Sequence, residues 1–348
     1  MQSIHLTSFL SPSSPFTTLS PISSPLPVPR ESEYLLRITH ISPQQVDLLY
    51  ARGKHQNNNP KRGHIHPPFT LGLDFSGTVL RSPRTPGEHL PPGTQVFGTH
   101  LGAFATHLCA PRSAIQPVPK GLSQRDAASL ASGAVSYACL PPLRKGQWIL
   151  VTGAPGFLAL ATAQLARARG AEVVLLTRNE MRCRAVAELD VCEGMHVLAS
   201  DGDWRTQVTR LTKGKGVDVV IDHVGLVADC LRTLAYGGTI VVVGFAGREG
   251  VMERLPMDRV LLRGAKVVGF RFGEGARKGV LDAQKCWEEY LECLAQGEVR
   301  PVVDRRRYSG LQSIGRAMQD LADGVPVGKA VVDVDADDNN EHRQAAKL

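Results

Sequence analysis

Two patterns of apolar and polar residues divide the chain. In the first third, short stretches alternate apolar and polar residues, as strands with one buried face do. Three such stretches span residues 33–42, 71–80 and 93–111, and proline-rich turns and glycines punctuate them. We therefore expect the first third of the chain to be rich in β-structure.

From about residue 123 the pattern changes to alternating helices and strands. Residues 123–143 are rich in alanine, and Ser123 is suited to cap a helix at its start. Further along, we expect apolar strands at 148–153, 172–177, 217–222 and 238–244, with helices at 156–169 and 179–188. This alternation is typical of βαβ units around a parallel sheet, whose strands are apolar on both faces.

The last part of the sequence adds two helices and a strand. The helices are expected near 280–296 and 311–323, and the strand within 328–335. Residues 336–348 are polar, so we expect a disordered tail there.

The segment GAPGFLA, residues 153–159, joins the first of these strands to its helix. A dinucleotide loop of the pattern G-x-G-x-x-G aims backbone N–H groups at a pyrophosphate. Gly156 matches the second glycine, Ala159 is a permitted third residue, and Ala154 departs from the first. We expect the loop to bind a dinucleotide, with an ordinary strand–helix turn as the alternative. Its candidate residues are Gly153, Ala154, Pro155, Gly156, Phe157 and Leu158.

The end of the next strand indicates which dinucleotide is bound. An NAD site places a carboxylate there to bind the ribose hydroxyls, whereas an arginine accommodates the 2′-phosphate of NADP. This chain has no carboxylate at that position and instead carries Thr177, Arg178, Asn179 and Arg182. We expect NADP(H), unless the two arginines only form a solvated start of a helix. His223 and Val224 follow strand 217–222, at the sheet edge where such folds bind ligands.

The composition narrows the class of protein. The chain has 348 residues, enough for two domains, with 43% hydrophobic and 21% charged residues, as in ordinary globular proteins. No apolar run approaches the ~20 residues that span a bilayer, so no membrane partner is expected. The net charge is +7, but the basic residues are scattered and lack interleaved aromatics, so no nucleic-acid partner is expected.

The cysteines and the N-terminal sequence indicate a compartment. Seven cysteines, an odd number without a CxxC pair, predict reduced thiols rather than disulfides or a structural zinc site. No charged segment followed by an apolar core opens the sequence, and no arginine precedes Arg30. A cytoplasmic protein is therefore expected.

Seven segments match, in order, those of one known family. They are LGLDFSGTV, GTQVFG…GAFATH, VPKGLSQRDAASLASGAVSYACL, GVDVVIDHVG, LAYGGTIVVVGFAG, LPMDRVLLRGAKVVGFRFG and GEVRPVVD…AMQDLADGVPVGKAVV. On these segments the chain resembles the medium-chain dehydrogenase/reductase superfamily, in its zinc-independent quinone oxidoreductase and enoyl reductase branch.

The resemblance implies a fold, a cofactor and a partner. The fold would be α/β, with a GroES-like β-rich catalytic domain at 1–122 and 270–348. A doubly wound Rossmann domain at 123–269 would bind NADP(H), with the cofactor between the two domains. The protein would be a homodimer, paired through the strand after Gly264.

The resemblance also separates this chain from the zinc-dependent alcohol dehydrogenases. That branch has a ligand cysteine where this chain has Ser42, Pro43 and Gln44. It also has a His–Glu pair before LGLD, whereas His64 and His66 have no neighbouring glutamate. We therefore expect no metal ligand.

Several site residues come from the resemblance alone. It places Ser136 near the nicotinamide, Gly244, Phe245 and Ala246 in the turn beside it, and Arg271 and Phe272 near the cofactor's edge. Gln44 and Tyr50 would border the substrate, with Tyr50 as a candidate proton donor or, alternatively, a half-buried core tyrosine. Asp47 would orient its neighbours or cap a helix.

The expected activity is NADPH-dependent hydride transfer, without zinc, to a quinone or an α,β-unsaturated carbonyl. Two alternatives remain open: a specialised enoyl reductase of a polyketide-type pathway, and a non-catalytic NADPH-binding protein.

Overall fold

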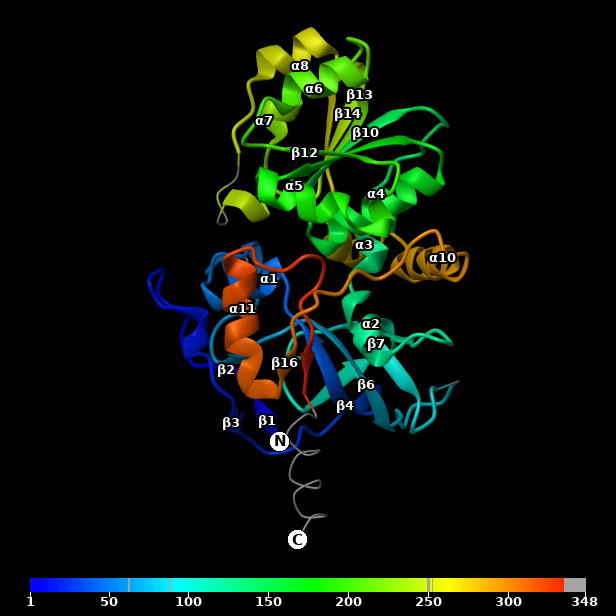
Figure 1. Ribbon diagram of the computed structural model, residues 1–348. Helices are drawn as coiled ribbons and strands as arrows, with labels where there is room; N and C mark the ends of the chain where they lie inside the picture. Colours follow the sequence, from blue (N-terminus) through cyan, green and yellow to red (C-terminus); the bar gives the residue numbers. More distant parts are fainter. Residues whose placement is uncertain (62, 88, 249–250, 252, 335–348) are drawn as a thin grey trace. The chain divides into compact units, whose positions relative to one another are not determined.

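The chain forms two compact units, shown in the computed structural model of Figure 1. The structure describes residues 1–61, 63–87, 89–248, 251 and 253–334, so the tail expected at 336–348 lies outside the described residues. Met1–Ser132 and the chain from Pro301 form the β-rich unit, and Gly133–Arg300 form the parallel-sheet unit.

These unit limits differ from the expected 123–269 at both ends, because two helices pack elsewhere than expected. Helix α2 (Gln124–Ser129) packs on the sheet of the β-rich unit, where Ser76 donates a hydrogen bond to the Gln124 carbonyl over 2.7 Å. Helix α10 (Ala283–Ala295) packs on α3 (Gly133–Ala138). A Cβ atom on Gly133 would lie 2.1 Å from the Tyr290 ring, so the two helices need a glycine there.

One mixed sheet builds the β-rich unit. Its strand order is β16-β17-β4-β6-β7-β9, β8 also pairs with β4, and all neighbours except β16 and β17 are antiparallel. Alternating residues of β4, Tyr34, Leu36 and Ile38, are fully buried, as the apolar–polar alternation predicts. The strands are β4 (Glu33–Ser42), β6 (Asp74–Arg81), β7 (Gln95–Thr99), β8 (His107–Pro111), β9 (Ile115–Pro117), β16 (Tyr308–Ser309) and β17 (Val332–Asp333).

The first thirty residues are tied to this unit by short pairings. Two small antiparallel pairs form, β1 (Gln2–Ser3) with β3 (Ile22–Ser23) and β2 (His5–Leu6) with β5 (Phe69–Thr70). Phe16 is buried, and the Arg52 guanidinium lies 4.5 Å from its ring centre. The helical elements of the unit, besides α2, are α1 (Gln45–Ala51), α11 (Ile314–Ala322), η1 (Phe16–Thr18), η2 (Gln56–Asn58), η3 (Arg112–Ala114) and η6 (Leu311–Ser313).

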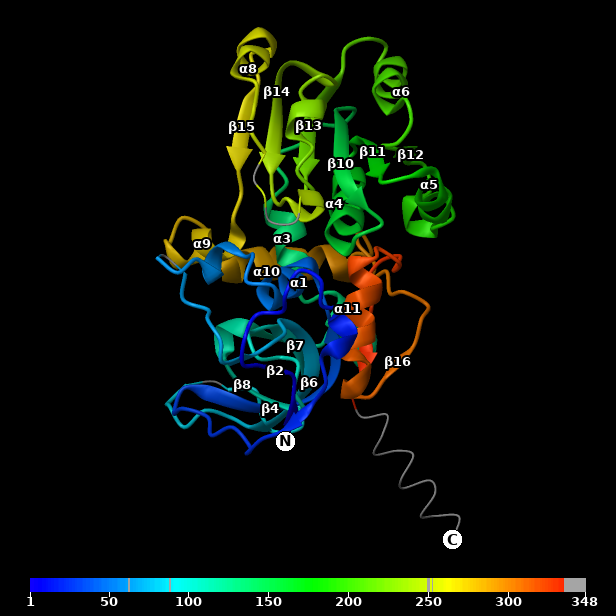
Figure 2. The same cartoon turned by 90° about the vertical axis from the view of Figure 1, so that its left-hand side faces the viewer.

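A six-stranded parallel sheet builds the other unit, with the order β12-β11-β10-β13-β14-β15 (Figure 2). The central strands are almost wholly buried because helices cover both faces, which is the apolar pattern the sequence predicts. The strands are β10 (Trp148–Ala154), β11 (Glu172–Thr177), β12 (His196–Ala199), β13 (Val217–Asp222), β14 (Leu234–Val242) and β15 (Lys266–Gly269).

The remaining helices of this unit connect its strands. They are α4 (Phe157–Ala168), α5 (Glu180–Ala187), η4 (Asp190–Cys192), α6 (Trp204–Leu211), α7 (Val227–Cys230), η5 (Ala246–Arg248), α8 (Met257–Arg263) and α9 (Phe272–Arg277). The sequence pattern did not predict β12 and α6, which are short. Together the units confirm the expected α/β fold. Among the described residues, no helix combines the length and apolar character needed to cross a membrane.

Candidate active site

The turn between β10 and α4 has the shape of a phosphate loop. Gly153 has φ of +93°, and a Cβ atom there would lie 3.0 Å from Cγ1 of Val224, so this position requires glycine. Gly156 donates its N–H to the Gly153 carbonyl over 2.9 Å and caps α4. Phe157 is buried, so its ring packs inward at the start of the helix. The N-terminus of a 12-residue helix therefore follows a tight turn, as anion sites require.

The end of β11 lies beside this turn, because Thr177 pairs with Ala154 across the two strands. Asn179 caps α5 by accepting a hydrogen bond from the Arg182 N–H over 3.1 Å. The Arg178 side chain is exposed, and that of Arg182 is half-buried on the first turn of α5. The structure thus brings the expected basic residues to the same edge of the sheet as the loop.

Asp222, at the end of β13, organises the next turn. Its carboxylate accepts hydrogen bonds from the Thr152 hydroxyl over 2.7 Å and from the N–H groups of Val224, Gly225 and Leu226. Burial raises the pKa of Asp222, and these donors oppose that rise. Asp222 was not among the residues predicted from the sequence, although a carboxylate that ends the apolar run VDVVID is a visible signal.

His223 follows Asp222 and is almost fully enclosed, with 8% of its surface exposed. Its backbone N–H donates to the Thr152 hydroxyl over 3.0 Å. Neither ring nitrogen has a hydrogen-bond partner in the described part of the chain. Burial lowers the pKa of the imidazole to about 4, so the ring is neutral near pH 7.

The turn after β14 wraps against the same residues. Ala246 donates its N–H to the His223 carbonyl over 3.2 Å, and Gly247 donates to the Val224 carbonyl over 3.0 Å. A Cβ atom on Gly244 would lie 2.9 Å from the His223 carbonyl oxygen, so glycine allows this close approach. Gly153, His223 and the turn at Gly244, Phe245 and Ala246 therefore lie next to one another.

Three further candidates are placed less centrally. Ser136 is buried on α3, and its hydroxyl donates to the Leu158 carbonyl over 3.2 Å, so it contacts the first turn of α4. Arg271 and Phe272 begin α9, just after Phe270 donates its N–H to the Val242 carbonyl. They therefore lie one strand further along the sheet, near the end of β14.

In the β-rich unit, Gln44 and Tyr50 occupy opposite ends of α1. Gln44 is the N-cap residue and Tyr50 lies in the last turn, about 9 Å further along at 1.5 Å per residue. The Tyr50 hydroxyl accepts a hydrogen bond from Nδ2 of Asn57 over 2.9 Å, and its ring packs edge-on against His55. Gln44 and Tyr50 thus contact different partners, Asp74 and Asn57 respectively.

A buried polar cluster that was not predicted from the sequence surrounds Gln44. Asp74 accepts hydrogen bonds at Oδ1 from Gln44 Nε2 over 2.9 Å and from Thr99 Oγ1 over 2.5 Å. At Oδ2 it accepts from Ser132 Oγ over 2.8 Å and from Lys329 Nζ over 2.7 Å. Its two oxygens thus have four donors, so the buried charge is compensated.

Asp47 is the second buried carboxyl of this region. Oδ2 of Asp47 accepts the Gln44 N–H over 2.8 Å, which closes a capping box, whereas Oδ1 has no partner among the described residues. Burial is the main cause of a pKa raised well above the ordinary value, and the charge of Asp74 adds to it. Of the two roles expected for Asp47, the structure shows the helix cap.

The described residues contain no group of three or more His, Cys, Asp or Glu side chains placed to hold a metal. Gln44, one of the three residues that stand where the zinc branch has its ligand cysteine, donates its amide to Asp74. His64 and His66 are exposed, and the His66 ring lies 3.3 Å from the Gly63 carbonyl oxygen.

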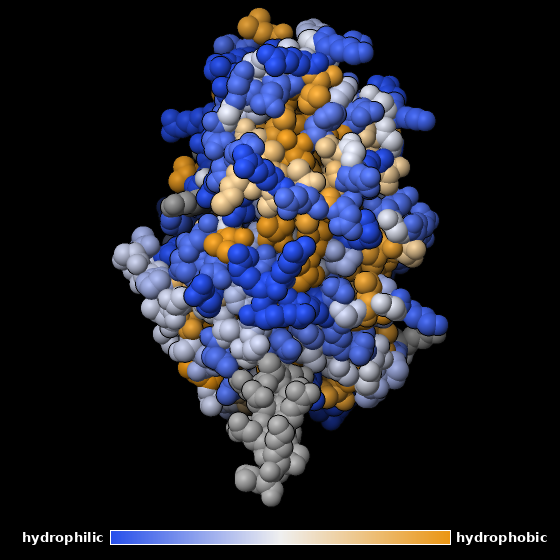
Figure 3. Space-filling model, in the orientation of Figure 1, coloured by the Kyte–Doolittle hydropathy of each residue, from blue (hydrophilic) through white to orange (hydrophobic). Residues whose placement is uncertain are grey.

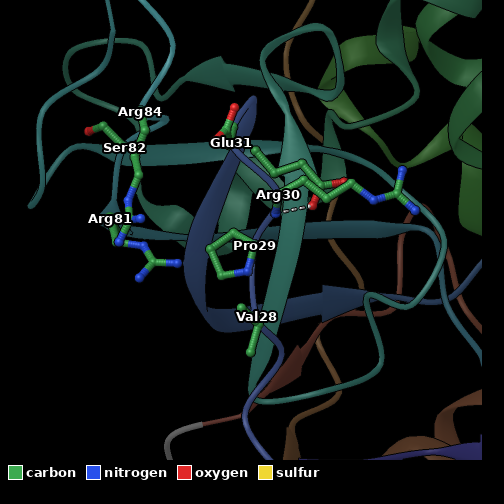
Figure 4. A pocket seen from close by; sticks show the side chains of 8 residues that line it. Val28, Pro29, Arg30, Glu31, Arg81, Ser82 and Arg84 are labelled. Atoms are coloured by element: carbon green, nitrogen blue, oxygen red, sulfur yellow. Dashed lines mark hydrogen bonds between the residues drawn. The ribbon is translucent and has the colours of Figure 1, made fainter.

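Two surface hollows lie away from these residues. One of about 120 Å³ lies between the start of β4 and the end of β6, and its lining includes Arg30, Arg81, Arg84, Glu31 and Glu33 (Figure 4). Its mixed charges favour no single ligand charge. The other, of about 410 Å³, follows the edge strand β12 and is lined partly by Val197, Leu198 and Leu211. Figure 3 shows apolar side chains gathered over this region of the parallel-sheet unit.

Comparison with known proteins gives three findings. The family described as zinc-binding dehydrogenase matches residues 158–297. Quinone oxidoreductase-like protein 2 of Mus musculus is 29% identical over 267 residues, covering 74% of this chain and 72% of that protein. A highly reducing polyketide synthase of Arthrinium phaeospermum is 27% identical over 342 residues, covering 91% of this chain but only 13% of the synthase.

A solved structure shares the fold. A mycobacterial protein determined in complex with NADPH superposes with a TM-score of 0.81 and 24% identity, covering 96% of this chain and all of that one.

Proposed function

Because the chain belongs to the medium-chain dehydrogenase/reductase superfamily, in its quinone oxidoreductase-like branch, we propose that it binds NADPH and reduces a quinone or an α,β-unsaturated carbonyl. The proposal starts from the activity of the superfamily, which is that of an oxidoreductase. The observation that carries the NADPH proposal is the shared sheet edge at which the β10–α4 turn meets Arg178 and Arg182.

The fit to a dinucleotide rests on features of this chain alone. A Cβ atom on Gly153 would crowd Val224, and one on Gly244 would crowd the His223 carbonyl oxygen. The turns that follow β10, β13 and β14 therefore pack closely against one another. The α4 N-terminus suits a pyrophosphate. The two guanidinium groups suit the 2′-phosphate that distinguishes NADPH from NADH.

In the proposed reaction, the parallel-sheet unit binds the nicotinamide cofactor, and residues of the β-rich unit supply the proton and orient groups beside the substrate. When bound, the reduced nicotinamide supplies a hydride, and the reduced acceptor then requires a proton. Tyr50 is our candidate for the proton donor, since the Asn57 amide donates to its oxygen and stabilises the charge left when the proton leaves. The Gln44 amide, held by Asp74, orients groups beside the substrate. We propose that the reaction needs no zinc, since Ser42, Pro43 and Gln44 stand where the zinc branch has its ligand cysteine.

Nucleotide titration tests the proposal. We expect tight NADPH binding, weaker NADH binding, and a loss of at least tenfold in NADPH affinity in Arg178→Ala or Arg182→Ala. Arg184→Ala is the matched control, because Arg184 lies on the same helix but pairs with Glu180 over 3.4 Å. Failure of the wild-type protein to bind either nucleotide would reject the proposal.

A second candidate activity is supported by the match to the polyketide synthase, which runs over 342 residues. In this version the acceptor is an enoyl intermediate of polyketide type. Turnover of quinones, free enones and enoyl thioesters under one set of conditions separates the two, because pocket shape decides the preference.

We also propose that the protein forms a homodimer through the parallel-sheet unit. β15 is one of the two edge strands of the parallel sheet, and α8 before it buries none of its residues. Large apolar side chains are exposed on or near these elements, with Tyr236 at 83%, Leu261 at 80% and Leu262 at 74%. Exposed apolar groups on this scale mark an interaction surface.

A further inference from the structure

His223 is a buried imidazole without the hydrogen bonds that burial requires. Both ring nitrogens are enclosed, and neither has a partner in the part of the chain that the structure describes. A buried nitrogen that loses its bonds to water destabilises the fold unless something replaces them. Such a group in a native protein calls for an explanation, and a ligand that supplies the missing partner is one.

The chemistry of the ring restricts what that ligand offers. A neutral imidazole presents one N–H donor and one nitrogen acceptor. The ring stays neutral here because burial lowers its pKa to about 4. It therefore suits uncharged groups that both donate and accept, such as hydroxyls and carboxamides, rather than phosphates.

The position of His223 in the sheet indicates which part of a dinucleotide carries such groups. A Cβ atom on Gly153 would lie 3.4 Å from Cβ of His223, so the residue begins beside the phosphate turn. β13 and β11 flank β10 on opposite sides. A dinucleotide with its pyrophosphate at this turn and its adenosine ribose toward Arg178 extends its other half toward β13.

We propose that His223 binds the nicotinamide riboside half of the cofactor directly, by hydrogen bonds between its ring nitrogens and the ribose hydroxyls or the carboxamide. This inference rests on the proposed NADPH binding. The enclosed nitrogens reach the ligand when the ring turns or when the turn at Gly244–Gly247 shifts, and in the free protein they stay covered.

The proposal predicts opposite effects on stability and on binding. His223→Leu removes the unpaired nitrogens at similar volume, so the thermal midpoint of the nucleotide-free protein stays equal or rises. The same change weakens NADPH binding roughly 3- to 10-fold. Binding of 2′,5′-ADP, which lacks the nicotinamide half, stays within twofold. His223→Gln, which keeps a donor and an acceptor, recovers part of the NADPH affinity.

His196→Leu is the matched control. His196 lies in the same sheet at the first residue of β12, where its ring stacks on Trp148. The identical substitution there leaves both ligands bound as in the wild type. The 3-acetylpyridine analogue of NADPH, which has no amide N–H, then distinguishes between these contacts. His223→Leu weakens binding of the analogue if the partner is a ribose hydroxyl or the carboxamide oxygen, which the acetyl group retains, and leaves it unchanged if the partner is the carboxamide N–H.

The nuclear magnetic resonance signals of the His223 ring nitrogens report directly on whether the ligand contacts the ring. With ¹⁵N-labelled histidine, NADPH shifts one pair of ring nitrogen signals that is missing in His223→Gln and unmoved by 2′,5′-ADP. This measurement decides the matter on the wild-type protein even if His223→Leu fails to fold.

Three outcomes overturn the proposal. One is unchanged NADPH affinity in a folded His223→Leu protein together with unmoved His223 signals. Another is an equal loss for NADPH and 2′,5′-ADP, which indicates a distorted phosphate turn. The third, a wild-type protein that binds neither nucleotide, rejects the proposed function as well, and so is distinguishable from the first two.

Discussion

Nζ of Lys329 lies 2.7 Å from Oδ2 of Asp74, and both side chains are buried in the β-rich unit. Lys329 comes just before the last strand and Asp74 begins β6, so the ion pair joins two distant parts of the chain. A buried pair of this kind is costly to break, since either partner alone leaves an uncompensated charge.

We therefore expect Lys329→Met to lower the free energy of unfolding by about 3–5 kcal/mol. Urea unfolding followed by tryptophan fluorescence and circular dichroism measures the change. Arg205→Met is the control, because the Arg205–Asp229 pair is exposed at 45% and 44% and such pairs contribute about 1 kcal/mol or less. Equal changes in the free energy of unfolding would show that the buried pair contributes no more to stability than the exposed pair. The double variant Lys329→Met/Asp74→Asn should recover stability relative to the single one.

Much of the fold could be predicted from the sequence, because strands that alternate apolar and polar residues, or that are apolar throughout, carry a strong signal. The strands expected at 33–42, 172–177 and 217–222 have these bounds in the structure. β12 could not be predicted in the same way, since it is a four-residue strand that begins with His196. α6 was also missed, because only Trp204 and Val208 of its eight residues are buried.

The residues of the candidate site could be predicted only where they come directly after the end of a predicted strand. The β10–α4 turn, the start of α5 and His223 are such places, and their roles in binding stay predictions. The Asp74 cluster could not be found this way, because Gln44, Thr99, Ser132 and Lys329 meet only when the sheet folds. Each of these residues taken alone is an ordinary polar residue.

The buried Asp47 gives a prediction about pH. Its pKa is raised in the folded protein, mainly by burial. Between the unfolded and folded pKa values the folded protein binds more protons than the unfolded chain, so stability falls as pH rises through this window. Asp47→Asn removes that dependence and keeps an oxygen for the Gln44 N–H.

We expect the thermal midpoint of Asp47→Asn to exceed that of the wild type by a margin that grows from about pH 4 upward. The nearby charges of Asp74 and Lys329 are unchanged in both proteins, so they cancel in the difference to first order. Thermal melts at one-unit pH intervals test this. A difference that is constant across pH would contradict the raised pKa.

Tyr50 provides a prediction for catalysis. Tyr50→Phe keeps the ring against His55 but removes the hydroxyl that accepts from Asn57. If the hydroxyl protonates the reduced acceptor, kcat falls roughly 100-fold or more, while the Kd of NADPH is unchanged. A quinone whose hydroquinone takes its proton from water loses less activity than an enone. Asn57→Ala keeps the Tyr50 hydroxyl but removes the donor that stabilises its anion, so kcat should fall less there than in Tyr50→Phe. A kcat that is unchanged in Tyr50→Phe would contradict the role of the hydroxyl.

The last prediction concerns the apolar surface of α8. Leu261 and Leu262 are 80% and 74% exposed, next to the edge strand β15. Burying a glutamate against an apolar partner is costly, so Leu261→Glu should raise the dimer dissociation constant at least tenfold. Sedimentation velocity across protein concentrations measures the shift from dimer to monomer. Val280→Glu is the control, because Val280 is 82% exposed but lies after α9, outside α8 and β15. A wild-type protein that sediments as a monomer at every concentration would contradict the proposed dimer, and a dimer unaffected by Leu261→Glu would assign pairing to another surface.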